Sequence, residues 1–289
     1  MTDFRNIESL RAFTSRILSE EFLVLFQSKV NYDIAPLIPI IQNYTEESEF
    51  GLRLISRYPL EKMSVLEVGA GAGILTAWLG LNGIRITGIE PSGIGYDFHG
   101  DLKEAIWSYF SLPGDLVKDL GVQHISRLEA KYDFIFSLNV LEHIPYAILE
   151  PAFQGMKSAL NLNGMMLHHC PNYFIPFEPH YGFPLIPFIP QLSGKLMGVE
   201  ADGVWQSLNF ITYSKVKRMA RKAGLRIIFH KGVMYDTFNR LEEDEVFAGR
   251  HKTLSRVYPV LRKLGLNLFL KNVPPALSTP MTFTCKADK

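Results

Sequence analysis

The sequence predicts an α/β protein with a doubly wound, mainly parallel sheet. From about residue 61 onwards, short apolar runs with the character of strands alternate with helical segments, which is typical of a parallel sheet covered by helices on both faces. A glycine-rich turn joins the first of these strands directly to a helix. The composition, 47% hydrophobic and 20% charged among 289 residues, excludes the disordered and fibrous classes.

The first 60 residues are expected to form a helical cap. Apolar residues at three- and four-residue spacing predict a first helix, and they are Ile7, Leu10, Phe13 and Ile17. The acidic run Thr45-Glu46-Glu47 predicts the start of another helix, ending near Tyr58. Charged side chains within the first eleven positions interrupt the apolar core that a signal peptide needs, so secretion is not expected.

Strands of the core are predicted at residues 64–68, 84–89, 134–137 and 165–170. The proline- and aromatic-rich stretch 172–205 is too long for a simple connection, so it is expected to be a lid or binding loop. The remaining elements are a basic helix at 212–222 ended by Gly224, a strand at 225–229, an insertion at 235–278 and a last strand at 281–285.

Three glycines between a strand and a helix predict a ligand site. Gly69, Gly71 and Gly73 let backbone N–H groups approach a ligand where a Cβ atom would clash. Glu90 ends the next predicted strand, where an acidic residue accepts hydrogen bonds from ribose hydroxyls. The alternative is a tight turn beside a solvated strand end. A dinucleotide loop needs a small residue where Ile74 stands, which disfavours an NAD-dependent oxidoreductase.

These motifs resemble those of class I S-adenosylmethionine-dependent methyltransferases. Residues 67–73 resemble the E-x-G-x-G-x-G loop of that family, 88–92 resemble its second-strand acidic motif, and 132–144 resemble its fourth-strand motif. The resemblance covers about residues 61–171, with weaker agreement to 230. It implies a mainly parallel seven-stranded sheet of the Rossmann-like methyltransferase fold. The methyltransferase domain would then span 61–289, with S-adenosylmethionine as cofactor and S-adenosylhomocysteine as product.

The resemblance also implies roles for particular residues. Glu67 would orient the loop or the cofactor's ammonium group, and Glu90 would hold both ribose hydroxyls. The other cofactor contacts implied are Gly69, Ala70, Gly71 and Gly73 at the methionine and ribose, Pro91 and Ser92 near the adenine, and Asn139 at the amino-acid part. Family members often carry an acidic residue at the end of the third strand. The stretch 122–128 contains none, so Ser126 is expected to take its place, with Arg127 as the alternative.

The acceptor site is expected in the predicted lid. Methyl transfer needs alignment of nucleophile and methyl group, and a hydroxyl acceptor must also lose a proton. Glu178, His180 and Tyr181 stand together in an apolar, proline-rich segment, and His180 is the favoured general base or substrate contact because histidine titrates near neutrality. The alternative is that His180 only packs in this loop. His143, in the pair Glu142-His143, is a further catalytic candidate, although a histidine there is more often packed.

Other partners are disfavoured by the sequence. A balance of 30 basic and 29 acidic residues lacks the surplus that nucleic-acid binding usually needs. Neighbouring His168 and His169 point to opposite faces of a strand, so no metal site is expected. Cys170 and Cys285 are expected toward opposite ends of the sheet, beyond disulfide reach, and two cysteines suit a reducing, cytoplasmic location.

The basic, apolar stretch 250–271 has two interpretations. It is either a helix packed on its own domain or an amphipathic segment in contact with an anionic membrane surface. The function expected from the whole sequence is S-adenosylmethionine-dependent methyl transfer, in the first place to an oxygen of a small-molecule, glycan or lipid-linked acceptor. A cofactor-binding protein that has lost catalysis is the alternative. The sequence leaves the oligomeric state open.

Overall fold

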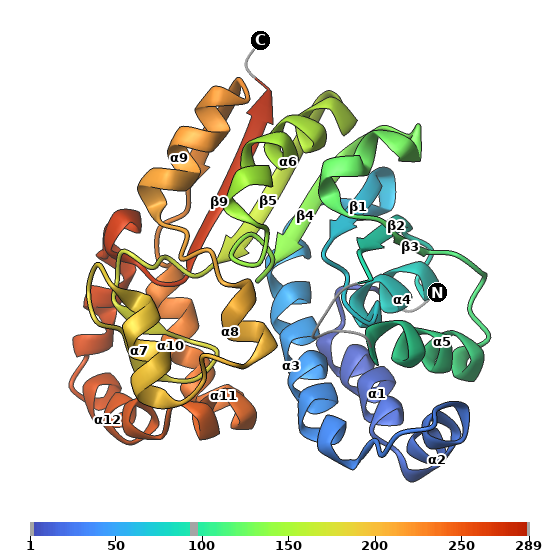
Figure 1. Cartoon of the computed structure of the whole chain (residues 1–289), viewed down its shortest axis with the longest axis horizontal. Helices are drawn as coiled ribbons and strands as arrows, with labels where there is room; N and C mark the ends of the chain where they lie inside the picture. The colour runs from blue at the N-terminus through green and yellow to red at the C-terminus, as the bar shows by residue number, and fades with distance from the viewer. Residues whose placement is uncertain (1–2, 93–97, 288–289) are drawn as a thin grey trace. The chain divides into compact units, whose positions relative to one another are not determined.

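The computed structural model describes residues 3–92 and 98–287 (Figure 1). It contains a seven-stranded sheet with the strand order β3-β2-β1-β4-β5-β9-β8, which confirms the predicted α/β class. The chain divides into two compact units. The first holds residues 1–137 and 158–164, and the second holds 138–157 and 165–289.

Helices open the first unit. They are α1 (Ile7–Ile17), α2 (Glu20–Lys29) and α3 (Ile38–Ile55). The 3-10 turn η1 (Ala35–Leu37) directly precedes α3. Asn6 and Ser19 accept hydrogen bonds from the first turns of α1 and α2, which satisfies backbone N–H groups that a helix start leaves open. The prediction that a helix starts at residues 45–47 is wrong, because they lie inside α3, whose first turn contains Pro39.

The strands of the first unit run parallel. After η2 (Leu60–Lys62) come β1 (Ser64–Val68), β2 (Arg85–Glu90) and β3 (Val117–Asp119), and β4 (Tyr132–Leu138) pairs with the other side of β1. Helix α4 (Ile74–Leu81) follows the glycine turn, and α5 (Phe98–Phe110) follows β2. The N-terminal helices pack on this part, α1 and α3 on α4 and α2 on α5. A 3-10 helix, η3 (Val122–Leu128), precedes β4.

The strands of the second unit form antiparallel pairs. Strand β5 (Leu160–Cys170), which follows α6 (Tyr146–Ala159), pairs with β9 (Met281–Ala287), and β9 pairs with β8 (Leu225–Phe229). Helix α9 (Tyr213–Lys222) lies against β8 and is followed by Gly224 with φ of +66°, so the predicted helix, its end and the strand are confirmed. Met166 stands opposite Cys285, and Cys170 stands opposite Met281. Four residues of β5 thus separate the two positions, as expected, and both cysteines are free and buried.

The stretch 172–205 has secondary structure of its own. A two-stranded hairpin of β6 (Phe177–Glu178) and β7 (Phe183–Pro184) is followed by α7 (Pro190–Met197) and α8 (Gly203–Ser207). Phe183, Leu185, Trp205 and Leu208 form a small buried core. Gly194 approaches the Trp205 ring so closely that a Cβ atom there would lie 2.2 Å from Cε2. The segment is therefore a packed substructure rather than an irregular loop.

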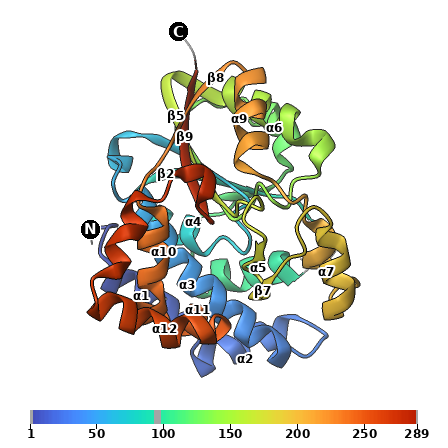
Figure 2. The same cartoon turned by 90° about the vertical axis from the view of Figure 1, so that its left-hand side faces the viewer.

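Residues 233–277 form a group of helices (Figure 2). They are α10 (Val233–Glu243), α11 (Glu245–Arg250), α12 (Lys252–Lys263), η4 (Leu266–Asn272) and η5 (Pro275–Leu277). Helix α12 packs on α10, α11 and η4, and its Tyr258 is buried with its hydroxyl bonded to Asn239 of α10. Within residues 3–92 and 98–287, no helix has the length and apolar character that crossing a membrane requires.

Candidate functional site

The glycine turn of the first unit has the backbone geometry that its sequence predicts. Gly69, Gly71 and Gly73 have φ values of +74°, +54° and +74°, a region that residues with a side chain rarely adopt. A Cβ atom on Gly73 would lie 2.9 Å from the Trp107 ring. Ala70 anchors the turn, since its N–H donates to the Ile89 carbonyl at 3.0 Å. Conformation therefore favours glycine at all three positions, and lack of space also requires it at Gly73.

The carboxylate of Glu90, at the end of β2, lies beside this turn. Its Oε2 accepts a hydrogen bond from the Gly71 N–H at 3.0 Å, and its Oε1 lies 3.3 Å from Nδ1 of His99. The other ring nitrogen of His99 lies 2.9 Å from the Tyr44 hydroxyl. Sequence reasoning missed His99 and Tyr44, which stand on α5 and α3 outside any motif. The two oxygens of Glu90 are thus held at the turn, in a position suited to a ribose diol.

Glu67 lies beneath the turn rather than on its surface. Its side chain is buried, and its Oε2 accepts a hydrogen bond of 2.5 Å from the Thr76 hydroxyl on α4. Burial raises the pKa of Glu67 to about 8; the Thr76 hydrogen bond lowers the pKa and the charge of Glu90 raises it. The bond ties β1 to α4 across the glycine turn, which supports the proposed orienting role of Glu67.

The third strand lies earlier in the sequence than predicted, so the argument for Ser126 loses its basis. Strand β3 ends at Asp119, whereas Ser126 is an exposed residue of the 3-10 helix η3. The Oδ1 atom of Asp119 accepts a hydrogen bond of 2.8 Å from the Ser92 N–H, and its Oδ2 accepts one of 2.7 Å from the Ser92 hydroxyl. An acidic residue therefore does end the third strand. Pro91 and Ser92 are exposed beside it.

The turn after β4 belongs to the second unit. Asn139 has φ of +53°, and its N–H donates to the His169 carbonyl at 2.8 Å. Asn209 holds the turn, because its side-chain amide donates to the carbonyls of Leu141 and Ile144 at 2.6 and 2.7 Å. The Asn209 N–H donates to the Glu142 carbonyl at 2.8 Å. The segment after α8 thus fixes the turn. The contact of Asn139 with the cofactor stays a prediction.

His180 and Glu178 form the close pair that the sequence predicts. Nδ1 of His180 lies 2.5 Å from Oε1 of the fully buried Glu178, which also accepts a hydrogen bond of 2.8 Å from the His180 N–H. The Tyr173 hydroxyl donates to Oε2 at 2.8 Å. Burial lowers the pKa of His180, but the hydrogen bond that its ring donates to Glu178 and the charges of Glu178 and Glu142 outweigh it, so the pKa is raised overall.

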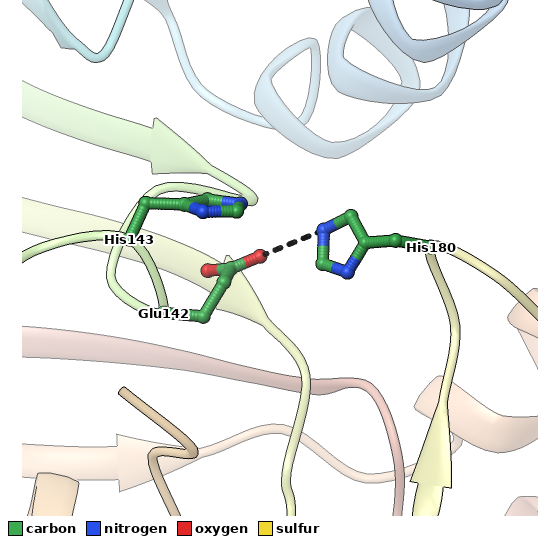
Figure 3. A group of neighbouring side chains, drawn as sticks. All are labelled: Glu142, His143 and His180. Atoms are coloured by element: carbon green, nitrogen blue, oxygen red, sulfur yellow. Dashed lines mark ion pairs between the residues drawn. The ribbon is translucent and has the colours of Figure 1, made fainter. Parts of the chain in front are cut away.

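Glu142 and His143 lie on the other side of His180 (Figure 3). Oε1 of the fully buried Glu142 is 3.8 Å from Nε2 of His180, and the rings of His143 and His180 have centroids 5.2 Å apart. Nδ1 of His143 lies 2.7 Å from the Ser207 hydroxyl. Burial lowers the pKa of His143 to about 3, with a further contribution from His180, so this ring is neutral at physiological pH. The structure thus brings two predicted catalytic histidines together.

Tyr181, His168 and His169 make packing contacts and hydrogen bonds outside the group formed by Glu142, His143 and His180. Tyr181 packs on Phe183 and Trp205, and burial raises its pKa far above the usual range, so its hydroxyl stays protonated and cannot take up the acceptor's proton. Nδ1 of His169 lies 2.8 Å from the Thr282 hydroxyl of β9. The His168 ring packs against Phe153 and Phe283 in the core, and burial lowers its pKa to about 3.

The fold is that of a methyltransferase domain. A family model described as a methyltransferase domain matches residues 43–230. The chain therefore belongs to the methyltransferase-domain family, which confirms the resemblance to class I S-adenosylmethionine-dependent methyltransferases and their cofactor.

The chain is also similar to curated relatives and to solved structures. An uncharacterized protein of Mycobacterium tuberculosis is 34% identical over 197 residues, which are 65% of this chain and 66% of the relative. A tRNA U34 carboxymethyltransferase of Nautilia profundicola is 32% identical over 37% of this chain and 34% of its own. An O-methyltransferase of Brevibacillus brevis, solved with S-adenosylhomocysteine, is similar in structure with TM-score 0.48 and 15% identity, over 89% of this chain and 80% of that one.

Replacement of Glu90 tests the cofactor site. Glu90→Gln keeps an acceptor for the Gly71 N–H but removes the negative charge, and hydrogen bonds to a charged group contribute about 1.5–3 kcal/mol each. We expect the affinity for S-adenosylhomocysteine, measured by calorimetry, to fall at least about tenfold. Glu104→Gln, at an exposed position of α5, is the matched control. An unchanged affinity, or thermal stabilisation by NAD instead, would contradict the assignment.

Glu67 predicts a pH-dependent stability. The folded pKa of about 8 exceeds the unfolded value of 4.5, so between these limits the folded state holds a proton that the unfolded state has lost. The free energy of unfolding should therefore fall by about 1.4 kcal/mol per pH unit in this window, relative to Glu67→Gln. Denaturant unfolding of the cofactor-free proteins at pH 5, 6, 7 and 8 measures this difference. Parallel pH curves for the two proteins would refute it.

Proposed function

We propose that this protein transfers the methyl group of S-adenosylmethionine to a hydroxyl oxygen of a small-molecule, glycan or lipid-linked acceptor. The acceptor oxygen attacks the methyl carbon, the carbon–sulfur bond breaks, and its electron pair stays on the sulfur of the departing S-adenosylhomocysteine. The glycine turn and Glu90 bind the cofactor. The match spans about two thirds of the length of the Mycobacterium tuberculosis relative. The activity of the whole protein is therefore a proposal.

The observation that supports oxygen as the acceptor atom is the group around His180. A neutral amine attacks a methyl group without prior loss of a proton, whereas a hydroxyl must lose its proton during the reaction. His180 lies between the carboxylates of Glu178 and Glu142, at 2.5 and 3.8 Å, and both raise its pKa. We therefore assign removal of the hydroxyl proton to the cluster formed by Glu142, His143, Glu178 and His180.

A surface of the second unit supports a lipid-linked acceptor. On α12 and η4, Val257, Leu264 and Phe269 are 47%, 65% and 72% exposed. Lys252, Arg256 and Lys263 of α12 are exposed as well and lie on a neighbouring side of the helix. Apolar side chains beside basic ones suit the boundary of a bilayer with anionic headgroups. We propose that this amphipathic surface contacts the membrane that carries the acceptor.

Methyl transfer is tested with cofactor that carries a labelled methyl group. We expect label in hydroxyl-bearing acceptors, among them polyprenyl-linked glycans, and at least tenfold less in analogues whose hydroxyl is replaced by hydrogen. Label in amines alone would reject the oxygen assignment. Binding of S-adenosylhomocysteine without transfer to any acceptor class would favour the alternative of a cofactor-binding protein without catalysis.

Sedimentation with vesicles tests the amphipathic surface. Removal of two exposed apolar side chains, in the double variant Val260→Ser with Leu264→Ser, should weaken binding to phosphatidylglycerol-containing vesicles about 30-fold, because each contributes on the order of 1 kcal/mol and about 1.4 kcal/mol is a factor of ten. Binding to the anionic vesicles should also decrease with salt. Leu162→Ser removes a 96% exposed leucine of the first unit and serves as control. Equal sedimentation of all three proteins would reject the contact.

A further inference from the structure

Glu142, His143 and His180 gather their side chains in one small region of the second unit (Figure 3). One nitrogen or oxygen atom from each residue lies within 4.8 Å of those of the other two. Glu142 and His143 come from the turn after β4, and His180 comes from the hairpin of β6 and β7. The two imidazoles and one carboxylate have the chemistry of a metal-binding triad.

The hydrogen bonds of His143 determine which ring nitrogen can bind a metal. The hydroxyl of Ser207 donates its proton to the Val204 carbonyl at 2.7 Å. Its oxygen must therefore accept the 2.7 Å hydrogen bond that it shares with Nδ1 of His143, so Nδ1 carries the proton. In the neutral ring the lone pair is then on Nε2. This assignment of the tautomer follows from the hydrogen-bond network.

His180 has the same arrangement with a stronger partner. Its Nδ1 donates to the Glu178 carboxylate at 2.5 Å, and Glu178 is itself held by the Tyr173 hydroxyl. Its Nε2 is the nitrogen that lies 3.8 Å from Glu142. Histidines that bind metals almost always donate the other ring N–H to a carboxylate, carbonyl or similar acceptor, which orients the ring. Both histidines here have such a partner on Nδ1.

We propose that Glu142, His143 and His180 bind one divalent transition-metal ion through the carboxylate and the two Nε2 atoms. Bonds of about 2.0–2.2 Å place ligand atoms on a tetrahedral ion about 3.4 Å apart. The separation of 3.8 Å between Nε2 of His180 and Oε1 of Glu142 is close to that value. All three ligand atoms lie within 4.8 Å of one another, so side-chain movements of about 1 Å would bring them to the ion. Mixed imidazole and carboxylate ligands suit Zn²⁺, Fe²⁺ or Mn²⁺.

Three protein ligands leave coordination positions on the ion open. We propose that the acceptor hydroxyl binds at one of them, an assignment that rests on the proposed function. A hydroxyl bound to a divalent ion would have a lowered pKa, so it would release its proton to solvent and react as an alkoxide. His180 then acts as a metal ligand instead of a general base. Glu178 and Ser207 are positioning residues, since they hold the two rings rather than contact the ion.

Metal binding is measured directly on protein freed of metal with a chelator. Titration with Co²⁺, followed by visible absorption, and with Zn²⁺, followed by calorimetry, should give one site per chain. In Glu142→Gln, His143→Ala and His180→Ala the affinity should fall at least about a hundredfold. His124→Ala is the matched control, because His124 is an exposed histidine on η3 of the first unit. Circular dichroism and the melting temperature report whether each variant is folded.

Ser207→Ala keeps the three ligands and removes only one orienting hydrogen bond, so it should weaken binding by about 10- to 100-fold without loss of fold. Wild-type protein that binds neither ion, or His143→Ala that binds as tightly as wild type, would overturn the site. The labelled-methyl assay, repeated with chelator, separates the two proposals. Transfer that is insensitive to chelator rejects the metal's role, whereas metal binding without any transfer retains the site and rejects the proposed function.

Discussion

The burial of two carboxylates, Glu178 and Glu142, is the constraint on which the arrangement of His143 and His180 depends. A carboxylate removed from water costs several kcal/mol unless hydrogen bonds or opposite charge compensate it. Three hydrogen bonds compensate Glu178. Its carboxylate accepts from the backbone N–H and the ring of His180, in the same hairpin, and from the Tyr173 hydroxyl. The ring of His180 is thereby fixed, and its second nitrogen lies toward Glu142. Compensation of the buried Glu178 carboxylate therefore fixes the geometry on which the proposed proton chemistry rests.

The cofactor site of the first unit is organised by a different physical requirement. Positive φ at three glycines forms the turn that follows β1. Because β1 and β2 are adjacent and parallel, Glu90 at the end of β2 lies next to the Gly71 N–H. These contacts join residues close in sequence or on adjacent parallel strands. They follow from the strand-turn-helix pattern itself, so the residue motif and the observed geometry agree well here.

Elsewhere the sequence was a weaker guide, for identifiable reasons. The third strand has only three residues, Val117–Asp119, too few to show a period, and it was placed several residues late. The start of α3 was placed inside the helix because an acidic run resembles a first turn. The stretch 172–205 showed no period because its elements are short, yet Trp205 and Phe183 give it a small core.

The sequence by itself determined the α/β class, the methyltransferase family and the glycine turn with Glu90, because these depend on local patterns of apolar residues, glycines and one acidic residue. It also singled out Glu178 and His180 together in one segment, and His143 apart from them in another. Only the tertiary structure decided that His143 and Glu142 meet His180. Side chains from the turn after β4 and from a hairpin beyond β5 come together through folding, and no spacing along the chain records that contact.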